Sequence, residues 1–156
     1  MLTVKPKAKA QSRTSERQFE KMFVDALKAH GIYSRHMADR IAGLPDRYLA
    51  GGTWVELKSV IAGKQILRAG EGLSPEQRRT MADLHEAGDD VHYLALVLLP
   101  SGKKVVILES VTAALNDTVY YATSELEDGK LETSSCLVRP YTQEGLDQII
   151  KRIVPF

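Results

Sequence analysis

A turn between two short apolar runs constrains the fold of this chain more than any other segment. Residues 47–49 and 53–60 are rich in strand-forming side chains, and Ala50-Gly51-Gly52 separates them. Short apolar runs joined by a glycine-rich turn predict a β-hairpin. The hairpin fixes which residues face each other, and therefore which side chains can act together.

The second strand of this hairpin carries charged side chains on one of its two faces. Trp54, Glu56 and Lys58 are expected to share that face, because side chains alternate along a strand. Val55 and Leu57 then point to the opposite face. A charged pair on an apolar strand is costly to bury unless an ion or a counter-charge meets it. Chemistry is therefore expected at this strand.

Composition limits the class of protein. With 156 residues and 44% hydrophobic content, the chain is long enough for one compact domain with a substantial core. The net charge of +1 gives no global attraction to a polyanion. A single cysteine, Cys136, excludes an internal disulfide and favours a reducing compartment. No apolar run approaches the ~20 residues that cross a membrane. We expect a cytoplasmic protein without a membrane partner.

The N-terminal residues differ in composition from the rest. Residues 1–14 contain Lys5, Lys7, Lys9 and Arg13 and no acidic residue. They are expected to form a flexible basic arm, either an unstructured tail or a segment that follows DNA phosphates and releases their counterions. Residues 15–156 are then expected to form a single domain.

Periodicity and capping residues predict the other elements of this domain. The order of helices and strands predicts an α/β fold with a mixed central sheet flanked by helices. Ser74, Pro75 and Gln77 fit the start of a helix, with a capping box between the serine and the glutamine. Helices are expected over residues 16–30, 75–87, 111–116 and 142–153; strands over 32–37, 91–99 and 104–109; a basic loop over 62–72; and an irregular or strand-like segment over 120–135.

Two carboxylates determine the chemistry expected at the hairpin. Asp46 precedes the first strand, and Glu56 lies within the second. Carboxylates that meet at strand ends form a hard oxygen site suited to Mg²⁺, with Mn²⁺ as a substitute. The backbone carbonyl of Leu57 is a candidate further ligand, and Lys58 could orient water or stabilise negative charge. The alternative is a solvated Glu–Lys ion pair worth ~0–1 kcal/mol.

The motif itself resembles a known signature. Pro45-Asp46 followed by Glu56-x-Lys58 looks like the pattern of the PD-(D/E)xK nucleases, which have a restriction-endonuclease-like fold. Glu20 precedes Gly31 by eleven residues, a helix spacing similar to that of members that resolve branched DNA.

Two further segments strengthen the resemblance. Lys58-Ser59 matches a residue pair often seen after the strand glutamate, and residues 73–77 before a helix ending at Gly88 are similar to virus-type replication-repair nuclease domains and related resolvases. The resemblance covers residues 15–108. Residues 110–156 lie outside it and are expected to be an elaboration of the domain.

The resemblance implies a role for each matched residue. Asp46 and Glu56 would bind the metal, and Lys58 would be the catalytic lysine. Glu20 would be a further metal-binding or nearby carboxylate, with Glu16 as its rival one turn earlier. Gln77 would support the site, although the capping box is an equally good explanation of that residue.

The resemblance also implies an activity and its partners. The expected function is a Mg²⁺-dependent DNA endonuclease, phage-like in size, that cuts branched DNA such as Holliday junctions as a homodimer. The alternatives are a nicking, restriction-like or general DNA-degrading nuclease, and a non-catalytic DNA-binding protein with the same fold. Trp54 is expected in core or dimer packing rather than base stacking. Candidate phosphate contacts are His36, Arg40, Lys64 and Arg68, besides the basic residues of the arm.

Overall fold

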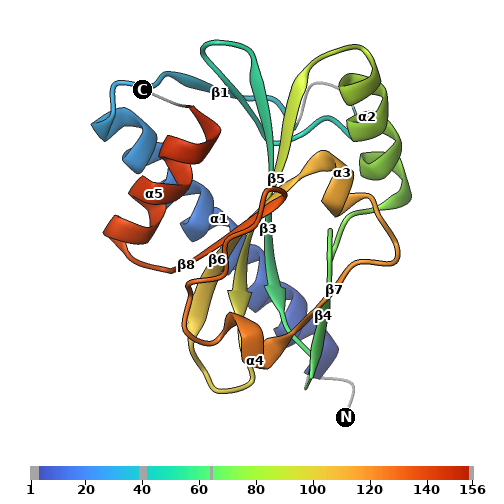
Figure 1. The fold of residues 1–156 in the computed structure, drawn as a ribbon, viewed down its shortest axis with the longest axis vertical. Coiled ribbons are helices and arrows are strands. Elements are labelled where there is room, and N and C mark those ends of the chain that lie inside the picture. The colour runs from blue at the N-terminus through green and yellow to red at the C-terminus, as the bar shows by residue number, and fades with distance from the viewer. Residues whose placement is uncertain (1–3, 39–41, 64, 155–156) are drawn as a thin grey trace.

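The computed structural model describes residues 4–38, 42–63 and 65–154, with side chains from residue 15 onward (Figure 1). Its elements, in chain order, are α1 (Val4–Ala29), β1 (Ser34–His36), β2 (Arg47–Leu49), β3 (Thr53–Ile61), β4 (Ile66–Arg68), α2 (Pro75–Glu86), β5 (Asp90–Leu98), β6 (Lys104–Ser110), α3 (Val111–Ala114), β7 (Tyr120–Ala122), α4 (Thr123–Leu126), β8 (Cys136–Pro140) and α5 (Gln143–Ile153).

A six-stranded mixed sheet forms the centre of the molecule. Its strand order is β1-β2-β3-β5-β6-β8. The β3–β5 pair is parallel and the other neighbours are antiparallel. Helices α1 and α5 cover one face, and α2 and α3 cover the other (Figure 1). The expected α/β fold with a mixed, helix-flanked sheet is confirmed.

The helical stripe of α1 anchors one face of this sheet. Phe19, Phe23 and Leu27 are fully buried and recur at the spacing of a single helix face. They pack in the same core cluster as Val55 and Leu57 of β3. Each such side chain stabilises the fold by about 1.5–3 kcal/mol. This packing holds the C-terminal half of α1 against the strand that carries Glu56.

The predicted hairpin and the predicted capping box are both confirmed. Strands β2 and β3 pair as Arg47↔Val55, Tyr48↔Trp54 and Leu49↔Thr53. At the start of α2, the Ser74 hydroxyl accepts a hydrogen bond from the Gln77 N–H at 3.1 Å. Both features depend on residues close in sequence, which is why a sequence pattern suffices to predict them.

Helix α1 begins earlier than expected. It starts at Val4 rather than near Glu16, so the backbone of the segment predicted to be a flexible arm is helical from residue 4 onward. Pro6 falls in the first turn, where a missing N–H breaks no helical hydrogen bond. The side chains of Lys5, Lys7, Lys9 and Arg13 lie outside the described residues.

Two segments were predicted incompletely. The basic loop over 62–72 contains β4, which pairs with β7 in a separate two-stranded sheet. The C-terminal residues add β8 to the main sheet, besides the final helix that was predicted, α5, whose Leu146 and Ile149 are fully buried. Strands β4 and β8 carry too little pattern to predict, because they pair with partners far away in sequence. No helix among the described residues is both long and apolar enough to cross a membrane.

Candidate active site

The candidate site lies on an open edge of β3. Strand β2 pairs only with Thr53 to Val55, so β3 has no neighbouring strand on that side from Leu57 onward. Side chains satisfy the exposed backbone instead. The Leu57 N–H donates to Asp46 Oδ2 at 2.8 Å, and the Ser59 N–H donates to the Glu16 carboxylate. The carboxylates of Asp46, just before β2, and of Glu16 on α1 therefore lie at one edge.

Asp46 and Glu56 meet at this edge. The β2–β3 register places them as the next pair beyond Arg47↔Val55, and their carboxyl groups lie within hydrogen-bonding reach. Two ionised carboxylates cannot make this contact, which requires a shared proton or a cation between them. Burial, followed by the charge of Asp46, raises the pKa of Glu56 to about 9. Burial also raises the pKa of Asp46.

One carboxyl oxygen of Glu56, Oε2, interacts with two donor groups. Gln77 Nε2 donates to Glu56 Oε2 at 3.2 Å, and Lys58 Nζ lies 3.5 Å from the same atom. Gln77 Oε1 accepts from the Ser74 N–H, so the glutamine serves the capping box and the site together. Glu56 Oε1, by contrast, is buried and receives no N–H or O–H donor from the described residues.

These groups line one cavity of about 270 Å³. Its wall is formed by α1, the start of β2, the middle of β3 and the first turn of α2. The lining residues are Glu16, Arg17, Glu20, Asp46, Glu56, Leu57, Lys58 and Gln77. The structure thus brings together Asp46, Glu56, Lys58, Glu20 and Gln77, which the sequence had singled out.

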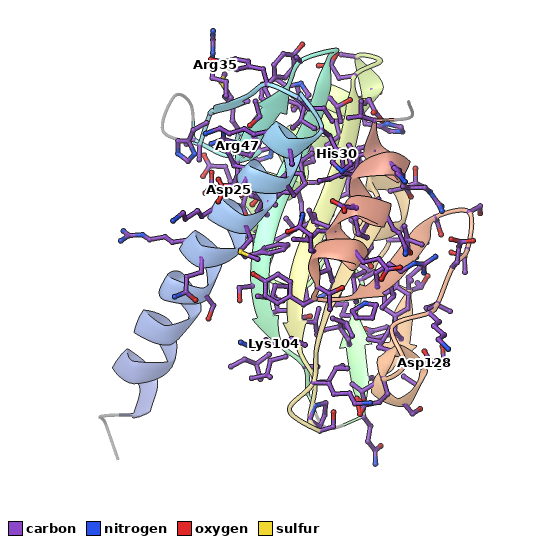
Figure 2. All side chains as sticks on the ribbon, turned by 90° about the vertical axis from the view of Figure 1, so that its left-hand side faces the viewer. Asp25, His30, Arg35, Arg47, Lys104 and Asp128 are labelled. Carbon is purple, nitrogen blue, oxygen red and sulfur yellow. The ribbon has the colours of Figure 1, made fainter. Side chains whose placement is uncertain are left out.

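The two helix carboxylates have different surroundings. Glu20 Oε2 accepts from Arg47 Nη1 at 3.1 Å and lies 3.0 Å from His36 Nδ1, so two basic groups already engage it. Figure 2 shows Arg47 beside α1. Glu16 instead faces Asp46 and Lys58, and burial raises the pKa of its carboxyl group. Both helix carboxylates are coupled to the carboxyl pair, because the charge of Asp46 acts on Glu16 and the charge of Glu20 raises the pKa of Asp46.

The donor set suits a hard divalent cation. No group of three or more His, Cys, Asp and Glu side chains in the described part of the chain is arranged to hold a metal. Mg²⁺ needs few protein ligands, however, because it retains several waters. Asp46 and Glu56 offer oxygens, and the Leu57 carbonyl points to the same edge as its N–H. The unpartnered Oε1 of Glu56, beside the carboxyl group of Asp46, is where a cation would fit.

The predicted phosphate contacts are not all at this cavity. His36 is bound to Glu20 close to the site. Arg68 lies on β4, pairs with Asp117 and does not line the cavity. Arg40 and Lys64 lie outside the described residues. Of the two that the structure describes, His36 contacts a residue that lines the cavity and Arg68 does not.

Three residues around the site were not predicted from the sequence. Arg17 lines the cavity, and Arg47 binds Glu20 from the neighbouring strand. Glu109, on β6, is buried and binds the backbone of the loop before α2. The Arg47–Glu20 contact spans 27 residues and the Glu109–Gly70 contact spans 39, so neither leaves a local pattern.

Comparison with known proteins gives a distant structural likeness. No protein-family model and no curated protein matches the sequence. Among solved structures, the chain is similar to Hjc, a Holliday junction resolvase of the archaeal hyperthermophile Archaeoglobus fulgidus, with a TM-score of 0.37 and 13% identity. The match covers 85% of this chain and 98% of that one.

Proposed function

We propose that this chain is a metal-dependent endonuclease that hydrolyses phosphodiester bonds in DNA. The observation that carries the proposal is the buried pair of Asp46 and Glu56, in which one glutamate oxygen has no donor among the described residues. A buried carboxyl pair with an unpartnered oxygen is costly as a purely structural element. A divalent cation would replace the shared proton and remove the repulsion.

Asp46, Glu56 and the Leu57 carbonyl are the groups that would hold the ion. A bound Mg²⁺ would polarise a phosphoryl oxygen and lower the pKa of the attacking water. Gln77 fixes the Glu56 carboxylate by binding Oε2, which leaves Oε1 for the ion. Lys58, next to Oε2, would orient water or stabilise the negative charge that develops on phosphate.

We further propose branched DNA as the substrate. This rests on the sequence pattern: the Pro45-Asp46 and Glu56-x-Lys58 motif, together with a helix glutamate spaced from Gly31 as in junction-resolving nucleases. Cutting two strands of a junction symmetrically requires two active sites, which favours a two-fold homodimer.

The experiment compares cleavage of a four-way junction with cleavage of its component duplexes. Each substrate is incubated with the purified chain in Mg²⁺, in Ca²⁺ and in chelator. We expect junction cleavage in Mg²⁺ only, with binding retained in Ca²⁺. Equal rates on junction and duplex would reject the branched-DNA preference, and Mg²⁺-independent cleavage would reject the metal-dependent mechanism.

Variants assign the activity to this site. Lys58→Ala is expected to abolish cleavage while junction binding remains, because phosphate contacts elsewhere dominate affinity. Glu86→Gln, an exposed change at the end of α2, is the matched control and should cut like the parent. Unchanged cleavage by Lys58→Ala would remove the lysine from the mechanism.

A further inference from the structure

Three side chains form a continuous row across the first three strands of the sheet. Arg35 of β1 pairs with Tyr48 of β2, and Tyr48 pairs with Trp54 of β3. Cross-strand partners share one face of a sheet. The two rings are arranged edge to face, with centroids 4.7 Å apart. We call Arg35, Tyr48 and Trp54 the aromatic row.

Two members of the aromatic row, Arg35 and Tyr48, are open to solvent, whereas Trp54 is partly buried and packs against the core cluster on that face, as the sequence predicts. Tyr48 is 37% exposed, and Tyr33, two residues before Arg35, is 68% exposed. Arg35 is exposed and makes no hydrogen bond or ion pair with the described residues. Figure 2 shows its side chain pointing away from the molecule. Helix α1 covers only the opposite face of these strands, where Leu49 is fully buried.

The row is fixed in place rather than loosely attached. Trp54 Nε1 donates a hydrogen bond to Asp89 Oδ2 at 3.2 Å, which sets the orientation of the indole ring. The Tyr48 ring packs against that indole. An aromatic surface that is already ordered loses little conformational entropy when a ligand binds to it.

The aromatic row is next to the carboxyl pair. Tyr48 lies two residues beyond Asp46 on the same face, and Trp54 lies two residues before Glu56. Two residues of a strand span roughly 7 Å. A nucleic-acid strand with its reacting phosphate at the carboxyl pair would therefore bring its first or second neighbouring nucleotide to the row.

We propose that the aromatic row binds an unpaired nucleotide next to the bond that is cut. The proposal rests on the nuclease function proposed above and gives that site a substrate feature: a base that is free to leave the duplex stack, as at a branch point. Every base has a π face that stacks on tyrosine or tryptophan without regard to sequence. The free guanidinium of Arg35 adds a planar cation for a base or phosphate.

The chemistry of the row favours this occupant over a protein partner. Its exposed surface consists of aromatic rings and a guanidinium, with no leucine, isoleucine or valine among its three members. The exposed isoleucines of the described residues, Ile61 and Ile66, lie at the far end of β3 and on β4. An interface between copies of this chain is the competing occupant and is tested below.

The test uses binding of a single-stranded oligodeoxythymidine of about 12 nucleotides, a length within the range that one such surface covers. Binding is measured in chelator, so that neither metal nor cleavage takes part. Trp54 is the only tryptophan of the chain, so its fluorescence reports directly on the row. We expect the oligonucleotide to quench this fluorescence.

Three variants make the test specific. Tyr48→Ala should weaken binding about 5- to 100-fold, the effect of removing one base-stacking aromatic side chain. Tyr48→Phe should stay within about twofold of the parent, because a phenyl ring still stacks. Tyr120→Ala changes another exposed tyrosine, on β7, and should bind like the parent. Circular dichroism and thermal unfolding establish that each variant is folded.

Several outcomes would overturn the proposal. Equal affinity of Tyr48→Ala and the parent would do so, and so would an equal loss in Tyr120→Ala. If Tyr48→Ala converts a dimer to a monomer by sedimentation but binds DNA normally, the row is an interface between copies. Cleavage of the junction is measured separately, so loss of the proposed activity with a preserved Tyr48 effect would reject the nuclease function alone.

Discussion

Two buried glutamates on the same face of the sheet differ in how many hydrogen-bond donors their carboxyl oxygens have. Glu56 of β3 and Glu109 of β6 are each 1% exposed, and both pair in register with Tyr93 of β5. They occupy equivalent depths on either side of one tyrosine. Burial alone therefore cannot explain why one belongs to a candidate site and the other does not.

Glu109 is fully satisfied by donors. Its Oε1 accepts from the Gly70 N–H at 2.8 Å, and its Oε2 accepts from the Tyr121 hydroxyl at 2.6 Å. Burial raises the pKa of Glu109, and these hydrogen bonds oppose that shift. Gly70 has a φ of +67°, and a Cβ there would lie 2.1 Å from the Ala114 carbonyl oxygen. Glu109 therefore fixes the tight loop that leads to α2.

Glu56 is incompletely satisfied and has a carboxyl neighbour. Gln77 and Lys58 both act on Oε2, whereas Oε1 has no donor among the described residues. Asp46 adds a second acid in contact with it. A buried carboxyl group whose two oxygens both accept hydrogen bonds has a structural role. A buried carboxyl group that keeps one oxygen without a donor, next to another acid, can bind a cation.

The largest expected effect comes from comparing two isosteric substitutions. Glu56→Gln should reduce cleavage by about 10³-fold, because losing a metal ligand forfeits several kcal/mol of transition-state stabilisation. Glu109→Gln should leave cleavage per folded molecule within a few-fold of the parent. It should instead lower the free energy of unfolding by about 1–3 kcal/mol, since the amide nitrogen would face a donor.

Single-turnover cleavage and urea unfolding of both variants measure this contrast. Exposed Glu86→Gln serves as the control for the change of charge. If Glu109→Gln abolishes cleavage while remaining folded, the division between a structural and a functional glutamate is wrong.

Metal binding should stabilise the folded protein, and this stabilisation should depend on the carboxyl pair of Asp46 and Glu56 but not on Glu109. At a Mg²⁺ or Ca²⁺ concentration of 100 times Kd, the parent should gain about 2.7 kcal/mol. That gain corresponds to a rise in Tm of roughly 5–10 °C for a domain of this size. Glu109→Gln should keep the rise, and Asp46→Asn should lose it. A rise that survives Asp46→Asn would place the ion elsewhere.

The pH dependence of stability in chelator should follow from Glu56. Its folded-state pKa of about 9 exceeds the ordinary value of 4.5, so the folded state holds a proton that the unfolded state releases. The stability contributed by this group is complete below about pH 4.5 and is lost as pH rises towards 9. The slope is at most about 1.4 kcal/mol per pH unit.

Urea unfolding at intervals from pH 5 to pH 8 measures this slope. Glu56→Gln should flatten the curve, because glutamine does not titrate, and saturating Mg²⁺ should flatten it as well. Parallel curves for the parent and Glu56→Gln would show that the proton is held elsewhere.

Local features of this molecule could be predicted from sequence, and long-range ones could not. The hairpin and the Ser74–Gln77 capping box each involve neighbouring residues. The hairpin register alone brings Asp46 opposite Glu56. The pairing of β4 with β7 and the contact of Glu109 with Gly70 link segments that no periodicity connects. Tertiary packing determines such contacts, and no local pattern in a single sequence predicts them.

The choice between Glu16 and Glu20 illustrates the same limit and gives the smallest expected effect. Spacing to Gly31 favours Glu20 but does not reveal which helix face meets β3. In the structure Arg47 and His36 engage Glu20, whereas Glu16 faces Asp46 and Lys58. We therefore expect Glu16→Gln to lower cleavage about tenfold, the scale of losing one charge near the reacting phosphate.

Glu20→Gln should change cleavage by less than about threefold. It should lower the free energy of unfolding by no more than about 1 kcal/mol, because the ion pair with Arg47 is partly exposed. Single-turnover rates of the two variants are compared at saturating Mg²⁺, so that a difference in their metal affinity does not affect the result. The opposite ranking, with Glu20→Gln the slower enzyme, would mean that binding of DNA or metal releases Glu20 from Arg47. The spacing to Gly31 would then be the better guide to the helix carboxylate.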